Sequence, residues 1–349
     1  MRRVGAGRIP DVSSLSFDAV LLIGFGGPGH RDEIRPFLRN VLRGRRVPTS
    51  RIEAVARHYE LFDGVSPLTA ITRRQAAGLR ARLAGDGPDL PVFVGMRNWH
   101  PFLDDTLAAM ASAGVRRALG IVLAAHHSYS SCGQYRQNVA DARHTLRARG
   151  VPDVEVLFAP GWHAHAGFIA ANVDRIERAR RQLPTALRRA ARIVFTAHSI
   201  PCAMAAESRY EAELRETAGL VCERLGTDNW TLVYQSRSGR PHDPWLEPDI
   251  CDYLRVEHER GLTAAVISPI GFVADHIEVL YDLDTEAATV CRTLGLPMRR
   301  AAAANDHAAF LDALADVTRA ACTRARGGRP LPIAPAAPPA RIEGPPLAR

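Results

Sequence analysis

Short apolar runs alternate with longer amphipathic stretches along most of this 349-residue chain. Turn residues bound the apolar runs, as expected for buried parallel strands, and the stretches between them carry apolar residues at helical spacing. The alternation predicts an α/β fold in which helices flank parallel sheets. The expected strands are 17–24, 90–95, 118–124, 154–158, 192–197, 230–234 and 264–268, and the expected helices include 32–42, 51–62, 69–84, 164–182, 207–225 and 306–325.

The polar loops that follow these strands occur in a similar order in the two halves of the chain. We therefore expect two similar Rossmann-like domains, 17–160 and 161–326. A leader at 1–16 precedes them, and a disordered tail rich in Pro and Ala follows at 327–349. Because ligands bind beyond the carboxyl ends of parallel strands, both domains should line one cleft.

The charge pattern favours a small anionic partner. The formal net charge is +8, and every basic side chain other than histidine is an arginine, because the sequence contains no lysine. An arginine-rich surface suits carboxylate-bearing and phosphate-bearing partners. The arginines are scattered among acidic residues and form no long basic block, so we expect a polyanionic small molecule and no nucleic acid.

Six cysteines are spread along the chain, and none forms a Cys-x-x-Cys pair. This spread indicates reduced thiols in an intracellular protein rather than a disulfide framework. No apolar run is long enough to cross a membrane, and the N-terminus has no apolar signal core. We expect a cytoplasmic monomer without a transmembrane segment.

The most unusual stretch follows the last expected strand. Asp275, Glu278, Asp282 and Glu286 recur at helical spacing, which places four carboxyl groups in a rough line on one helix face. Like charges four residues apart normally cost a few tenths of a kcal/mol, about 0.2–0.5. Two interpretations are open: a solvated acidic face, or a path that handles cations or protons.

His198 directly follows an expected strand, and Glu278 follows another. An imidazole and a carboxylate could form a weak, exchangeable site for Fe²⁺, and a histidine can accept a proton near neutral pH. The alternative for His198 is a hydrogen-bonded structural histidine. Of the adjacent His126 and His127, at most one should face the cleft, because neighbouring side chains diverge.

The string Gly24-Phe-Gly-Gly-Pro-Gly29 matches the dinucleotide-binding pattern Gly-x-Gly-x-x-Gly. Pro28 interrupts the turn, however, and the second strand that should end in an acidic residue about 20 residues later is missing. A dehydrogenase is therefore a distant alternative. Close approach of the backbone to some other flat ligand stays open, because glycines permit it.

Several motifs resemble those of the ferrochelatases, which insert iron into a porphyrin. The resemblance covers about residues 17–325 and implies two chelatase-type domains with a porphyrin cleft between them. It also implies a lyase of haem biosynthesis. The motifs are Gly64-Val-Ser-Pro-Leu68, Gly95-Met-Arg-Asn-Trp-His-Pro101, Thr196-Ala-His-Ser-Ile-Pro201, Tyr234-Gln-Ser-Arg237, Pro244-Trp-Leu-Glu-Pro248 and the stretch 271–284.

By these motifs, the resemblance makes His198 and Glu278 the catalytic residues that bind Fe²⁺ and help to remove the two pyrrole protons. Asp282 and Glu286 would extend a carboxylate path for metal or protons. The resemblance further implies porphyrin contacts from Phe25, Tyr59, Ser66 and Tyr135, and pairing with propionates by Arg43 and Arg45.

Within the family, the strings at 22–29, 40–45 and 130–138 look most like the actinobacterial-type coproporphyrin III ferrochelatases. This implies coproporphyrin III, with four propionates, as the substrate. Protoporphyrin IX is the alternative, and a non-catalytic tetrapyrrole carrier is the more distant one. Phe25 stands where some relatives have a tyrosine or methionine, and it cannot ligate iron.

Some relatives hold a [2Fe–2S] cluster with one internal and three C-terminal cysteines. Cys132 matches the internal cysteine, but the C-terminal region offers only Cys322, and such a cluster needs four thiolates. We expect no cluster and no permanently bound cofactor, with Fe²⁺ as a substrate.

Overall fold

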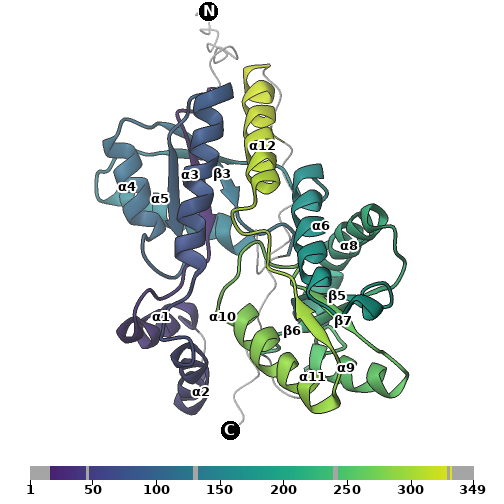
Figure 1. Ribbon diagram of the computed structural model, residues 1–349. Coiled ribbons are helices and arrows are strands. Elements are labelled where there is room, and N and C mark those ends of the chain that lie inside the picture. The colour runs from purple at the N-terminus through teal and green to yellow at the C-terminus, as the bar shows by residue number, and fades with distance from the viewer. Residues whose placement is uncertain (1–15, 45–46, 129–132, 239–242, 328–330, 332–349) are drawn as a thin grey trace, which may run out of the picture.

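The computed structural model describes residues 16–44, 47–128, 133–238, 243–327 and 331, and it confirms the α/β fold (Figure 1). Two four-stranded sheets form the centres of its two halves, and all of their neighbouring strands are parallel. The strands are β1 (Ala19–Gly24), β2 (Val92–Met96), β3 (Arg117–Val122), β4 (Glu155–Phe158), β5 (Arg192–His198), β6 (Trp230–Gln235), β7 (Ala265–Ser268) and β8 (Met298–Arg300).

The two sheets have the same strand order, β2-β1-β3-β4 and β6-β5-β7-β8. The similar order of the polar loops in sequence therefore corresponds to similar places at the ends of equivalent strands. Strand β8 has no counterpart among the sequence predictions. It carries two arginines in three residues and lacks an apolar run. This is possible because, among the described residues, β8 pairs with β7 alone and lies at the edge of the sheet.

Most helices occur close to their predicted positions. The structure has no helix long and apolar enough to cross a membrane, as far as it describes the chain. The helices are α1 (Ile34–Val41), α2 (Thr49–Glu60), α3 (Leu68–Asp86), α4 (Leu103–Ser112), α5 (Gln134–Ala148), α6 (Ala166–Arg181), α7 (Cys202–Ala206), α8 (Tyr210–Leu225), α9 (Ile250–Glu259), α10 (Ile277–Val279), α11 (Ala288–Leu294) and α12 (Ala308–Arg326), with the short 3₁₀ helices η2 (Arg31–Glu33) and η4 (Thr185–Leu187).

Between α10 and α11 the chain forms a π-helix, η5 (Leu280–Ala287), so that one helical stretch continues from Ile277 to Leu294. Hydrogen bonds in a π-helix run from i to i+5; such turns are rare and frequently lie at functional sites. The sequence pattern predicts a helix here but not its π-type turns.

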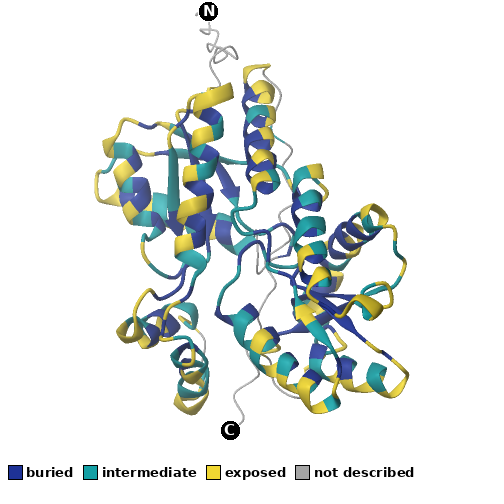
Figure 2. Ribbon diagram, viewed as in Figure 1, coloured by how far each residue is buried: buried dark blue, intermediate teal, exposed yellow. Residues whose placement is uncertain are grey.

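Alternation along the strands decides which helices cover each face of a sheet. In β1, Val20 and Leu22 pack with α3 and α12, whereas Leu21 and Ile23 point to the other face and pack with α4 and α5. In β5, Phe195 packs toward α6 and α8, and Val194 packs toward α9 and η5. The central strands β1, β5 and β7 are therefore almost completely buried between helical layers (Figure 2).

The last helix, α12, packs into the first half of the molecule (Figure 1). Its residues Phe310, Leu311 and Leu314 share a buried cluster with β1 and α3. A Cβ on Gly78 of α3 would lie 2.4 Å from Cδ1 of Leu311, so the glycine allows the two helices to approach closely. The domain boundary near residue 160 stays a prediction. Helix α12 follows this boundary in sequence but packs against the half that precedes it.

Candidate active site

His198 and Glu278 come together at the carboxyl end of the second sheet. His198 is the last residue of β5, and Glu278 lies in α10, which follows β7. Because β5 and β7 are hydrogen-bonded neighbours, their carboxyl ends meet at one edge of the sheet. Nε2 of His198 lies 3.8 Å from Oε2 of Glu278, and the two side chains are 32% and 41% exposed. The pair is therefore open to a ligand.

A hydrogen bond sets the tautomer of His198. Its Nδ1 lies 2.5 Å from the carbonyl oxygen of Ser199, which can only accept, so Nδ1 carries the hydrogen. In the neutral ring, Nε2 then holds the lone pair, and it faces Glu278. The hydroxyl of Tyr210 donates to the carbonyl oxygen of His198 at 3.0 Å and holds the same turn in place. The pair offers ligands for a divalent cation and acceptors for a proton.

His276 is a third member of this site. Its Nε2 lies 3.6 Å from Oε2 of Glu278, and its Nδ1 lies 3.1 Å from the carbonyl oxygen of Ala274. Burial lowers the pKa of His276, but the close contact with Glu278 and the negative charge of that carboxylate have the larger effect, so the pKa of His276 is raised overall.

Glu278 is held as an anion at neutral pH. Its side chain is open to solvent on one side, while the surrounding protein still acts to raise its pKa. The close contact with His276 and the electrostatic effect of the two imidazoles, His198 and His276, outweigh this effect and lower the pKa of Glu278 to about 2. A fixed negative charge beside a histidine lone pair favours the arrival of a cation.

Gly271 lets the loop before α10 approach β5. A Cβ at this position would lie 2.6 Å from Cβ of Ala197, and the N–H of Gly271 donates to the carbonyl oxygen of Thr196 at 3.0 Å. This close contact, one residue before His198, helps to bring the loop that carries Glu278 beside the histidine.

We expect Gly271→Ala to lower the free energy of unfolding by about 1–3 kcal/mol, because the added methyl group forces the loop away from β5. Urea unfolding measures this change. The matched control is Gly219→Ala on α8, where an added Cβ has no neighbour within 4 Å. That helical substitution should stabilise the protein by about 0.5–1 kcal/mol. The same sign for both substitutions would contradict the steric argument.

The acidic residues Glu278, Asp282 and Glu286 follow one another along α10 and η5. Oδ2 of Asp282 accepts hydrogen bonds from Nε2 of Gln235, at 3.1 Å, and from the hydroxyl of Ser236. Glu286 lines a surface pocket with Asp249 among other residues. The line of carboxyl groups therefore extends from the histidine site to the surface.

Asp275 does not belong to this line, so the predicted set of four is wrong at this position. The helix begins only at Ile277, after an extended residue, His276, and Asp275 therefore lies before the helix face forms. Its carboxylate pairs with Arg300 at 2.9 Å and accepts a hydrogen bond from Asn305 at 2.8 Å. Asp275 therefore fixes the loop before α10 and does not continue the acidic line.

Asp282 should make stability depend on pH. Burial, together with the charges of Glu278 and Glu286, raises the pKa of Asp282 from 3.8 to about 7, although Ser236 and Gln235 oppose the shift. Between these two values the folded state binds more protons than the unfolded state, so stability falls as pH rises. We expect the melting temperature of Asp282→Asn, minus that of the wild type, to increase as the pH rises across this interval. A difference that is constant with pH would contradict this assignment.

Side chains of the first half face the site from α2, α5 and the loop after β1. Phe25 and Tyr59 belong to one apolar cluster with Ile277 and Leu280 of the second half. Burial raises the pKa of Tyr59, and the charge of Glu278 raises it further. Burial also raises the pKa of Tyr135 to about 12, with smaller opposite effects from Arg97 and Glu278. The charge of Glu278 therefore affects the pKa of both tyrosines.

The remaining residues expected to contact the substrate are Ser66, Arg43 and Arg45. Ser66 is buried, and its N–H donates to the carbonyl oxygen of Pro28 at 2.8 Å. Arg43 is exposed at the end of α1 and donates to Oδ1 of Asn40 at 3.1 Å. Arg45 lies outside the described residues. Substrate contacts from these three side chains stay predictions.

The glycines at 24–29 have a packing explanation. A Cβ on Gly24 would lie 2.8 Å from Sδ of Met96, and a Cβ on Gly27 would lie 2.7 Å from Cβ of Ser66. Gly26 has a φ of 85°, which favours glycine. The loop leads into the three-residue η2 and only then into α1, so no α-helix begins directly after the glycines, where it could face a pyrophosphate. Nothing here favours a dinucleotide.

Cys132 lies outside the described residues, and Cys322 is buried on α12. The described cysteines are free thiols, Cys202, Cys222, Cys251, Cys291 and Cys322. The expected absence of an iron–sulfur cluster stays a prediction.

Sequence reasoning missed three polar residues of the site, His276, Gln235 and Ser236. His276 stands two residues before Glu278, and the sequence argument considered only carboxyl groups in that stretch. Gln235 ends β6, and Ser236 follows it. Like His198, they lie at the carboxyl end of a parallel strand, where ligands usually bind. The argument that selected His198 therefore applies to them too.

Solved structures with a similar fold include a chelatase, SirB. SirB from Bacillus subtilis with Fe³⁺ matches with a TM-score of 0.54 and 13% identity, over 90% of this chain and 98% of SirB. The sirohydrochlorin chelatase SirB from Bacillus subtilis subspecies spizizenii, in complex with cobalt, matches with a TM-score of 0.52 and 11% identity, over 90% and 98%. The protein therefore has the chelatase fold.

Sequence comparison is more specific. The ferrochelatase family model matches residues 17–322. A coproporphyrin III ferrochelatase of Streptomyces coelicolor is 44% identical over 93% of this chain and 91% of its own length. One of Mycolicibacterium smegmatis is 42% identical over 87% and 89%, and a ferrochelatase of Rhodopirellula baltica is 45% identical over 85% and 84%. The chain belongs to the ferrochelatase family.

Proposed function

We propose that this protein inserts Fe²⁺ into coproporphyrin III and releases two protons. The relatives carry the choice of substrate, because those from Streptomyces coelicolor and Mycolicibacterium smegmatis bear the name coproporphyrin III ferrochelatase and match most of the chain. The reaction needs reduced iron, and we place the protein in the cytoplasm, acting as a monomer.

His198 and Glu278 jointly supply a ligand for the incoming metal and an acceptor for the pyrrole protons. Insertion exchanges two N–H protons for one Fe²⁺, so a base near the macrocycle lowers the barrier. Nε2 of His198, which holds a lone pair, lies 3.8 Å from Oε2 of the anionic Glu278. Both groups can therefore approach the pyrrole nitrogens at the centre of one porphyrin. His276 steadies the Glu278 carboxylate.

The acidic residues beyond the pair provide a route for the ions. Asp282, with a pKa raised to about 7, can take up and release a proton near neutral pH. Glu286 continues the line to a surface pocket. Protons that leave the porphyrin, or iron that approaches it, would pass along these carboxyl groups.

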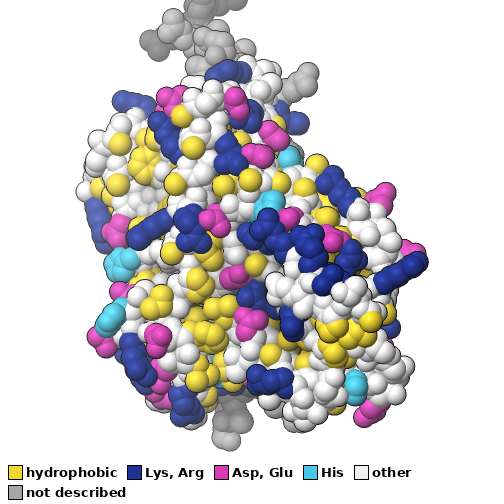
Figure 3. Space-filling model, in the orientation of Figure 1, with side chains coloured by type: hydrophobic (Ala, Val, Ile, Leu, Met, Phe, Trp, Pro, Cys, Tyr) yellow, Lys and Arg dark blue, Asp and Glu magenta, His cyan; other side chains and the backbone are white. Residues whose placement is uncertain are grey.

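The porphyrin would lie between this pair and the aromatic side chains of the first half. Phe25 and Tyr59 pack with Ile277 and Leu280 beside Glu278, so they can supply the flat apolar surface that a macrocycle needs. The propionates would reach arginines such as Arg43 and Arg45. Arginines are spread over the face in Figure 3 with acidic side chains between them, which suits a small anion better than a long nucleic acid.

The test of the substrate is anaerobic turnover with Fe²⁺, with coproporphyrin III and protoporphyrin IX supplied separately. Absorbance of the metallated product gives kcat/KM for each. We expect at least about a tenfold preference for coproporphyrin III, the equivalent of one additional charge-assisted contact. A preference for protoporphyrin IX would overturn the substrate and keep the reaction. Tight binding of both without metallation would leave a tetrapyrrole carrier.

A further inference from the structure

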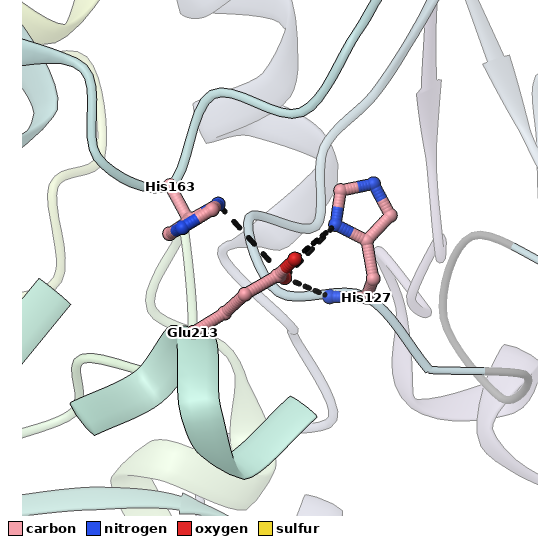
Figure 4. Close-up of side chains that lie close together, drawn as sticks. All are labelled: His127, His163 and Glu213. Atoms are coloured by element: carbon pink, nitrogen blue, oxygen red, sulfur yellow. Dashed lines mark hydrogen bonds and ion pairs between the residues drawn. The ribbon is translucent and has the colours of Figure 1, made fainter. Parts of the chain in front are cut away.

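A second group of potential metal ligands lies apart from the His198–Glu278 pair. His127, His163 and Glu213 each offer one ligand atom, and these atoms lie within 4.8 Å of one another (Figure 4). His127 follows β3, His163 precedes α6, and Glu213 lies on α8. The Glu213 side chain is only 4% exposed, whereas those of His127 and His163 are 25% and 14% exposed. The group is partly open and connects the two halves of the chain.

The contacts of His163 leave one ring nitrogen directed at the carboxylate. Nε2 of His163 lies 2.9 Å from Oε2 of Glu216, and this carboxylate can only accept, so Nε2 carries the hydrogen. In the neutral ring, Nδ1 then holds the lone pair. Nδ1 is buried, has no hydrogen-bond partner among the residues that the structure places, and lies 3.9 Å from Oε2 of Glu213.

A lone pair and a buried carboxylate thus face each other with no hydrogen between them. Two acceptors in this position repel, and a buried acceptor without a donor costs about 1–3 kcal/mol in general. A cation between them would bind both atoms and remove this cost. The arrangement of His163 also matches a common feature of metal sites, in which a carboxylate holds the far nitrogen of a histidine ligand and thereby orients the ring.

His127 is held ready on the other side of Glu213. Its backbone N–H donates to Oε2 at 2.7 Å, and its Nδ1 lies 2.9 Å from the same oxygen, so Nδ1 carries the hydrogen in the neutral ring. A cation would take the place of that hydrogen, which then resides on Nε2, and Nδ1 becomes the ligand atom. The Cε1 edge of its ring points at Gly161, where a Cβ would lie 2.4 Å from Cε1. The Glu213 carboxylate also lies 3.4 Å from Nε of Arg209, on a side chain that is 69% exposed and can turn away into solvent.

We propose that His127, His163 and Glu213 form a binding site for a divalent transition metal such as Zn²⁺, Co²⁺ or Fe²⁺. Two imidazoles and one carboxylate are ligands that these ions prefer, and they leave coordination positions open for water. Metal–ligand distances near 2.0–2.2 Å require the three ligand atoms to move together by about 1 Å. The bound ion would join the first half to the second, and the proposal does not depend on iron insertion by the His198–Glu278 pair.

The test is anaerobic titration of the metal-free full-length protein with Co²⁺, followed by its visible ligand-field absorption. To remove binding at the proposed catalytic pair, all proteins carry His198→Ala. We expect one Co²⁺ per chain in this background and at least about a 100-fold weaker affinity after His163→Ala. Glu216→Gln, which keeps the ligands but removes the orienting carboxylate, should weaken binding by about 10- to 100-fold.

The matched control is His144→Ala, which removes an exposed histidine on α5. It should leave the Co²⁺ affinity and the absorption unchanged. Equal Co²⁺ affinity with and without His163 would overturn the site, as would a Glu216→Gln variant that binds like its parent. Circular dichroism of each variant separates loss of the site from loss of the fold.

Discussion

Replacement of His198 by alanine should lower kcat/KM for iron insertion by about 10²- to 10⁴-fold, the range expected when a positioned base is lost. The structural reason is the fixed tautomer. The carbonyl oxygen of Ser199 holds the hydrogen on Nδ1, so the lone pair of Nε2 is directed at Glu278 and at whatever lies between them. Alanine removes that lone pair without adding bulk.

The measurement is the rate of coproporphyrin III metallation at saturating and limiting Fe²⁺, with porphyrin binding followed separately by fluorescence quenching. Porphyrin affinity should change little, because the aromatic surface from the first half remains. His144→Ala is the control, since His144 is exposed on α5. A His198→Ala enzyme with wild-type kcat/KM would remove His198 from the reaction.

Glu278→Gln should lower kcat/KM by about 10²-fold or more, because glutamine has the size of glutamate but can neither balance the charge of Fe²⁺ nor accept a proton. The pKa of Glu278 is lowered to about 2, so the wild-type carboxylate stays charged throughout the neutral range. The loss in the variant should therefore be the same at every pH from about 6 to 8.

The Fe²⁺ dependence distinguishes the roles of Glu278. If the carboxylate binds the metal, the Fe²⁺ concentration for half-maximal rate rises with the substitution, while porphyrin affinity is kept. Glu259→Gln, an exposed substitution at the end of α9, should leave the kinetics unchanged. A Glu278→Gln enzyme that keeps full activity would contradict the proposed pair.

Local signals in the sequence were sufficient to predict most of the fold. Strands such as β1 and β5 are continuous apolar runs because both faces of a parallel sheet are covered, and these runs were found. Strand β8 was missed because an edge strand with neighbours on one side can consist of Met and two Arg. Strand β8 forms by pairing with β7, which lies about 30 residues earlier and contains the apolar run that β8 lacks.

The same distinction holds at the sites. The positions of His198 and Glu278 could be predicted, because each follows a strand end and the motifs around them resemble a known family. The role of Asp275 could not be predicted from spacing, because its partner Arg300 is distant in sequence and the helix start decides the direction of the side chain. The group of His127, His163 and Glu213 is likewise formed only by tertiary packing.

The position of α12 affects how this protein can be made. The apolar face of β1 that carries Val20 and Leu22 is covered partly by Phe310, Leu311 and Leu314. The first sheet emerges early from the ribosome, yet its core lacks these side chains until α12 has been synthesised. Nascent domains usually fold in order from the N-terminus. In this chain the half that is synthesised first is completed last, so it must keep an apolar surface unoccupied while the second half is translated.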